Sequence, residues 1–147
     1  MSRVEKVEFA SPAWLAAAEE VLQKALADVD LEGRTYAISE EFTDPPAHLL
    51  REGEKTVGWH FRVSDAGVQV GEGALEDADL RTRVDYQAVL PLARTVYGTS
   101  EEEIAAVMKM REEVRLTGER VGDETAFPPH LLQRLFEVHN ELALRTA

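Results

Sequence analysis

The first apolar pattern along the chain has helical spacing. Between positions 14 and 26, apolar residues recur every three or four positions, and charged residues occupy the opposite face. Ser11 and Pro12 come directly before this stripe, and a hydroxyl residue followed by proline is typical of a helix start. We therefore predict a helix that begins after Ser11 and ends near Asp28–Asp30.

Four segments with β-type alternation follow the predicted helix. Turns rich in glycine, proline or aspartate separate them, and they span Arg34–Phe42, Thr56–Val63, Val68–Gly73 and Asp77–Tyr86. Apolar and polar positions alternate, so each strand has one apolar face. Because the links between consecutive segments are short, we predict an antiparallel meander.

Helical spacing returns in the second half of the chain. Asp85 is expected to cap a helix that Gly98 ends, and Ser100 with Glu103 matches the capping box of a further helix. Residues Val114–Val121 alternate as a fifth strand, and paired prolines open a last helix. The predicted order is helix, four strands, two helices, strand, helix. We find no repeat or linker, so this α+β fold is expected to form a single domain over residues 1–147.

Charge and cysteine content narrow the range of functions. The net charge is −12, which disfavours nucleic acid as a partner because phosphate binding needs a basic surface. Charged residues interrupt every apolar stretch, so stable membrane insertion is not expected. The chain has no cysteine and no signal-peptide pattern, which fits a cytoplasmic location.

The second half resembles the sterol carrier protein type 2 family of lipid-binding proteins. Four segments carry the resemblance: Ala78–Val84, Val89–Gly98, Val114–Glu119 and the closing helix Leu131–Leu142. It covers roughly residues 59–142. The resemblance implies a five-stranded, mostly antiparallel sheet covered on one face by helices. It also implies an apolar tunnel between them that takes a fatty acyl chain, sterol or similar lipid and leaves it chemically unchanged, with no cofactor.

The candidate pocket residues are the inward-facing apolar positions of the predicted helices. They are Leu90, Ala93, Val96, Tyr97, Ile104, Val107, Met108, Leu131, Leu132 and Leu135. Core residues have the same pattern, so plain core packing stays open for each of them. The tunnel itself rests on the family resemblance.

His60 is the candidate polar anchor of this site. It lies in mid-strand between Trp59 and Phe61, on the face that also carries arginines, and could orient a ligand carboxylate. The alternative is a solvated sheet face with Glu–Arg pairs, to which Glu40 and Glu41 supply the acids.

Two further functional hypotheses belong to other classes. A small enzyme could act on an apolar or anionic metabolite in the same cavity, with His60 as its base. A structural or oligomerisation module, for example a homodimer, could bury the surfaces of Trp14 and Leu49–Leu50. The four histidines show no zinc spacing, and neither a dinucleotide fingerprint nor a nucleophile elbow is present, so we predict no metal site and no catalytic residue.

Overall fold

The computed structural model describes residues 5–147 and contains one five-stranded sheet and four α-helices. The strands are β1 (Tyr36–Thr43), β2 (Thr56–Ser64), β3 (Gly67–Glu72), β4 (Leu80–Asp85) and β5 (Glu119–Val121). The α-helices are α1 (Pro12–Ala25), α2 (Tyr86–Ala93), α3 (Glu101–Arg115) and α4 (Pro129–Leu144), and two short 3₁₀ helices span Ala47–Leu49 and Glu124–Ala126. This confirms the α+β class and the predicted element order.

The sheet has the order β3-β2-β1-β4-β5 and is antiparallel except between β1 and β4, which are parallel. The predicted meander of four strands is therefore wrong at its last step. The link after β3 crosses the sheet instead: the backbone N–H of Leu75 donates to Ser39 Oγ at 2.9 Å, and that of Asp79 to the Ala37 carbonyl at 2.9 Å. These bonds carry β4 to the far side of β1.

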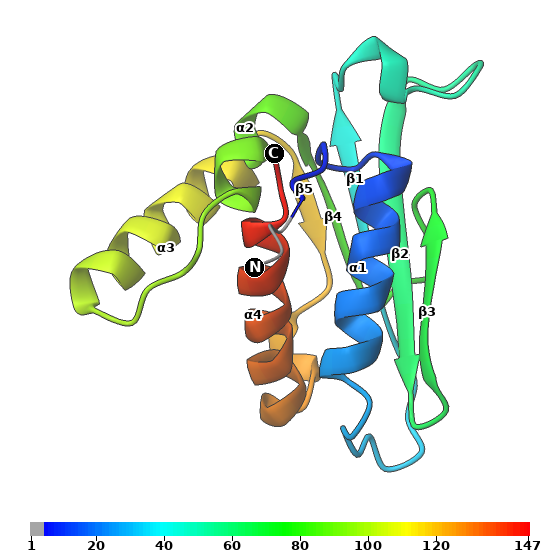
Figure 1. Cartoon of the computed structure of the whole chain (residues 1–147), viewed down its shortest axis with the longest axis vertical. Coiled ribbons are helices and arrows are strands. Elements are labelled where there is room, and N and C mark those ends of the chain that lie inside the picture. The colour runs from blue at the N-terminus through cyan, green and yellow to red at the C-terminus, as the bar shows by residue number, and fades with distance from the viewer. Residues whose placement is uncertain (1–4) are drawn as a thin grey trace.

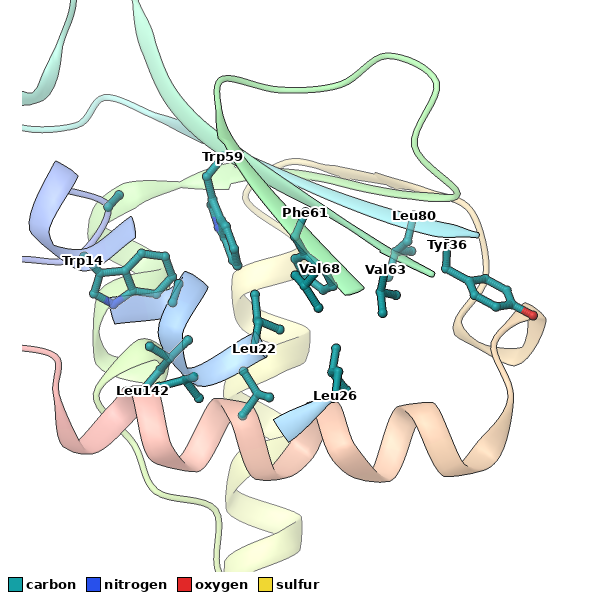
Figure 2. Packing of buried hydrophobic residues seen from close by; sticks show 14 of the residues in the cluster. Trp14, Leu22, Leu26, Tyr36, Trp59, Phe61, Val63, Val68, Leu80 and Leu142 are labelled. Atoms are coloured by element: carbon teal, nitrogen blue, oxygen red, sulfur yellow. The ribbon is translucent and has the colours of Figure 1, made fainter. Parts of the chain in front are cut away.

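Helices α1 and α4 lie side by side across one face of the sheet, and α3 projects away from them (Figure 1). Large apolar side chains from both layers meet there. Figure 2 shows Leu22 of α1 and Leu26, the C-cap of that helix, facing Phe61 and Val63 of β2. The opposite face of the sheet has no such helical cover in this view. A site between sheet and helices is therefore restricted to the first face.

The helix starts agree with the predicted caps. The side-chain oxygens of Ser11, Asp85 and Ser100 accept backbone N–H groups in the first turns of α1, α2 and α3. Each such bond satisfies a donor that the helix itself leaves free. A cap involves residues only three positions apart, so local sequence suffices to predict it.

Two boundaries in the second half differ from the prediction. Helix α2 ends at Ala93 rather than near Gly98. Side chains of α4 form hydrogen bonds with the backbone of the segment that follows α2: His139 Nε2 donates to the Thr95 carbonyl at 2.9 Å, and the Tyr97 N–H donates to Asn140 Oδ1 at 2.7 Å. The predicted strand Val114–Val121 is also shorter, because α3 continues to Arg115. Val114 follows Val107 by two helical turns, and both are buried.

The two ends of the described chain meet in the structure. Val7 and Thr146 form an isolated parallel bridge, with the Val7 N–H donating to the Arg145 carbonyl and the Ala147 N–H to the Val7 carbonyl, both at 2.8 Å. Trp14 lies beneath this junction and donates its indole N–H to Thr146 Oγ1 at 3.1 Å. Since Trp14 is only 4% exposed, the hypothesis that it forms a partner surface is wrong.

Candidate functional site

A row of polar side chains crosses the helix-facing side of the sheet. Strand register places Trp59, Glu40, Thr82 and Arg120 opposite one another on β2, β1, β4 and β5. The rows on either side are apolar: Phe61, Ile38 and Leu80 on one side, and Val57, Phe42 and Val84 on the other. We call the four residues from Trp59 to Arg120 the polar row. It puts hydrogen-bonding groups in the middle of an otherwise apolar surface.

Glu40 is the central member of the polar row. Trp59 Nε1 donates to its Oε1 at 2.9 Å. Burial raises the pKa of Glu40 above its usual value of 4.5, while the Trp59 hydrogen bond and the charge of Arg120 act in the opposite direction. A buried carboxyl group whose pKa is raised is a candidate for a functional position.

The segment between α2 and α3 places Tyr97 against α4. Its ring stacks on His139 of α4 with a centroid distance of 3.8 Å and contacts Phe136 at 5.4 Å. Burial raises the pKa of Tyr97 to about 12; the charge of Arg111 lowers it, and those of Glu40 and Glu124 raise it.

Asn140 determines where Tyr97 lies. Its Oδ1 accepts the Tyr97 N–H at 2.7 Å, and its Nδ2 donates to the Tyr97 carbonyl at 3.4 Å. The imidazole of His139 donates to the preceding Thr95 carbonyl, and burial lowers the pKa of His139. This irregular segment is thus attached to α4 by side chains that satisfy its backbone.

An ion-pair cluster connects α3 to the end of the sheet. Arg111 of α3 approaches Glu124 Oε1 at 2.8 Å, and Arg120 of β5 contacts the same oxygen. Burial acts to raise the pKa of Glu124, but the hydrogen bond from Arg120 and the charges of both arginines outweigh it and lower that pKa. Both guanidinium groups therefore already have a carboxylate partner.

The predicted pocket residues fall into three groups. Val107 and Leu131 are buried, and five others are partly buried: Leu90, Ala93, Tyr97, Leu132 and Leu135. Val96, Ile104 and Met108 are 48%, 49% and 55% exposed. The helical stripe on α3 is thus covered at Val107 and open at Ile104 and Met108.

His60 lies on the other side of the sheet. It alternates with Trp59 and Phe61, which point toward the helices (Figure 2), and its Nδ1 bonds the Gly73 carbonyl at 2.8 Å on the link that crosses the outer face. His60 therefore cannot anchor, or act as base on, a ligand held between the sheet and the helices.

The outer face carries the expected Glu–Arg pairing in part. Glu41 accepts the Thr56 hydroxyl at 2.7 Å and lies 3.6 Å from Arg83 Nε. Glu40 was expected on this face as well, and that prediction is wrong. In β1 it shares the parity of Tyr36, Ile38 and Phe42, so strict alternation was the signal that could have placed it on the apolar side.

Two surface pockets of about 220 Å³ each lie elsewhere in the structure, and of the polar row only Thr82 contributes to the lining of one of them. The first is on the outer face and the link that crosses it, where Ser39, Arg81 and Glu119 contribute to its lining. The second lies between the N-terminal segment and α2, where it includes Tyr86 and Leu90. Within residues 5–147, no three acidic or histidine side chains converge to hold a metal ion, and no helix is long and apolar enough to cross a membrane.

Comparison with known proteins identified similar structures but no matching family model and no matching curated protein. A solved structure described as "UbiJ-SCP2 Ubiquinone synthesis protein" is 17% identical, with a TM-score of 0.43, over 94% of this chain and 96% of the other. A solution structure of a conserved hypothetical protein from Thermus thermophilus, described as possibly sterol carrier protein, is 19% identical, with a TM-score of 0.49, over 97% and 94%. Both descriptions name the family that the sequence resembles. At these identities and TM-scores, the likeness assigns neither a ligand nor an activity to this chain.

Proposed function

We propose that this chain binds and carries a hydrophobic small molecule, such as a fatty acyl chain, a sterol or a similar lipid. The ligand would lie between the helix-facing side of the sheet and helices α3 and α4. The protein would release the ligand chemically unchanged. The proposal requires an apolar surface that the chain itself covers incompletely, together with few polar contacts.

The stripe on α3 is the observation that carries this proposal. Val107 is buried, whereas Ile104 and Met108, three positions before and one position after it, are about half exposed. Apolar area left in water at a helix face is a source of binding free energy, about 25 cal/mol for each Å² that a ligand covers. Methionine also adapts to ligands of different shapes because its thioether chain is flexible.

The apolar contact between α4 and the sheet supports the same proposal. Leu131 and Leu135 of α4 belong to or pack against the apolar cluster that covers the sheet, and the rows beside Glu40 are apolar. A ligand with a long hydrocarbon part would therefore meet apolar side chains from both layers. The polar row offers the few hydrogen-bonding groups that fix its orientation.

A direct test measures ligand binding by the full chain. The purified protein should show a lipid adduct in native mass spectrometry, or it should increase the emission of Nile red, an uncharged apolar dye, in a way that added lipid reverses. Transfer of a fluorescent lipid between donor and acceptor vesicles should then be faster with the protein than without it. The absence of any adduct together with no dye binding would refute the proposal.

A further inference from the structure

A pocket of about 220 Å³ lies on the outer face of the sheet. Strands β1, β4 and β5 form its floor, and the link between β3 and β4 forms a wall. Its lining includes Ser39, Leu75, Glu76, Arg81, Glu119 and Val121. Sites for drug-sized ligands usually enclose about 300–1,000 Å³, so this pocket would take a smaller molecule.

Hydrogen bonds fix the wall of the pocket to its floor. His60 Nδ1 bonds the Gly73 carbonyl at 2.8 Å, just before the part of the link that lines the pocket. The Leu75 N–H donates to Ser39 Oγ at 2.9 Å, within that part. The wall is therefore held in place without a ligand, and small-molecule sites are usually pre-formed in this way.

Two donors on the floor have no acceptor within the described chain. Ser39 is 2% exposed and its Oγ accepts from Leu75, but among residues 5–147 its hydroxyl donates to no group. Arg81 is half-buried and lies beside Ser39 across the β1–β4 pair. Its guanidinium forms neither a hydrogen bond nor an ion pair within the same range of residues. Buried polar groups of folded proteins normally have partners, so both donors point to an acceptor that a ligand supplies.

The next arginine on the same face, Arg83, is in a different situation. Glu41 and Glu119 lie opposite it on the two neighbouring strands, and Glu41 Oε1 is 3.6 Å from Arg83 Nε. Arg81 has uncharged residues at both corresponding positions. Arg81 is therefore the guanidinium of this pocket that can bind a carboxylate, for which its planar group of donors is well suited.

Two glutamates decide which kind of carboxylate fits. Within residues 5–147, the side chains of Glu76 on the wall and Glu119 on β5 form no hydrogen bond and no ion pair. The lining contains three glutamates and two arginines, so a plain anion would meet net repulsion. A plain amine would leave Arg81 without an acceptor. A molecule with both a carboxylate and an ammonium group satisfies both kinds of side chain.

We propose that this pocket binds a small α-amino acid. The carboxylate accepts from Arg81 and from the Ser39 hydroxyl. The ammonium group faces Glu119, which lies diagonally from Arg81 within reach of a long side chain. An aliphatic side chain of the ligand contacts the apolar part of the lining. The site is on the opposite side of the sheet from the proposed lipid site, so this inference is independent of the proposed function.

The test follows the isotope-labelled full chain by NMR during titration with L-leucine. Isocaproate and isoamylamine are the matched probes, because each keeps the carbon chain of leucine and lacks either the ammonium group or the carboxylate. Leucine should shift the amide signals of Leu75 and Arg81. Both probes should bind at least about tenfold more weakly, since each loses charge-assisted hydrogen bonds. Glycine should also bind more weakly than leucine, because it covers less apolar area.

Two variants test the two ends of the ligand separately. Arg81→Gln should weaken leucine binding by at least about tenfold and leave isoamylamine binding unchanged. The double variant Glu76→Gln and Glu119→Gln should weaken leucine binding by about fivefold and should not weaken isocaproate binding. Arg34→Gln is the matched control. Arg34 is an exposed arginine before β1 that forms no ion pair within residues 5–147, and its replacement should leave leucine binding unchanged.

The inference is overturned if neither leucine nor glycine shifts these signals, or if Arg81→Gln binds leucine as tightly as the unmodified protein. Isocaproate binding as tight as that of leucine would also overturn it. Should Arg81→Gln not fold, the double glutamate variant decides. Nile red binding by Arg81→Gln should equal that of the unmodified protein. An unmodified protein that binds leucine but no dye or lipid would refute the proposed function and support this inference.

Discussion

The indole N–H of Trp59 donates a 2.9 Å hydrogen bond to the carboxyl group of Glu40, its direct neighbour across the β1–β2 pair. Both residues lie on the apolar side of the sheet. The bond satisfies one carboxyl oxygen and leaves the other available on the side that faces the helices.

Replacing Glu40 by glutamine should stabilise the protein at neutral pH more than in acid. The folded-state pKa of Glu40 is raised above 4.5, so folding favours the protonated form. Its contribution to stability is therefore fully present below about pH 4.5 and is lost as the pH rises through the folded-state pKa. Urea unfolding of both proteins at pH 4 and pH 8 measures the difference. An equal difference at both pH values would contradict the prediction, and Glu41→Gln serves as the outer-face control.

Asp65 should stabilise the protein at neutral pH and lose this contribution in acid, which is the reverse of the effect of Glu40. Its two oxygens accept the N–H groups of Leu31 at 2.7 Å and Gly33 at 2.8 Å, which lowers its pKa below 3.8. The stability it contributes is present above pH 3.8 and is lost as the pH falls through the lower folded-state pKa. In Asp65→Asn, unfolding free energy should decline less steeply over this acidic range. Glu52→Gln, in an exposed turn, should leave the acid profile unchanged.

The double substitution Ile104→Gln and Met108→Gln should weaken Nile red binding by about fivefold, because it removes apolar area that the ligand would cover. Both side chains are about half exposed, so the unfolding free energy should change by less than about 1 kcal/mol. Leu116→Gln is the control: Leu116 is 75% exposed and lies just beyond α3. Equal effects of the control and the double variant on dye binding would count against α3 as part of the site.

Gly118→Ala should destabilise the fold by about 1–3 kcal/mol. A Cβ at this position would come within 1.7 Å of the Arg83 carbonyl oxygen, which is backbone of β4 and cannot move without disturbing the sheet. Gly98→Ala is a matched comparison, because there the added Cβ meets the Glu103 side chain, which can rotate away. Thermal and urea unfolding of the two variants should differ clearly, and similar stabilities would refute the steric argument.

Much of the fold could be predicted because the relevant interactions are local. The caps at Ser11, Asp85 and Ser100 use side chains three residues from their partners, and alternation within each strand depends on backbone geometry alone. The helix boundary at Ala93 could not be predicted in this way. It depends on His139 and Asn140, more than forty residues away, which satisfy the backbone of the following segment.

The candidate site, like the fold, could be predicted from the sequence only in part. The sequence determined that β1 has one apolar face, and its alternation places Glu40 on that face. Only the tertiary structure decided what Glu40 meets there, because the crossing of the link after β3 makes β4 the parallel neighbour of β1. That crossing brings Thr82 and Arg120 into line with Glu40 and Trp59. In the predicted meander, β2 and β3 would have separated Thr82 of β4 from Glu40 of β1. Strand order depends on which distant segments pair, and the alternation within a single strand carries no information about its neighbours.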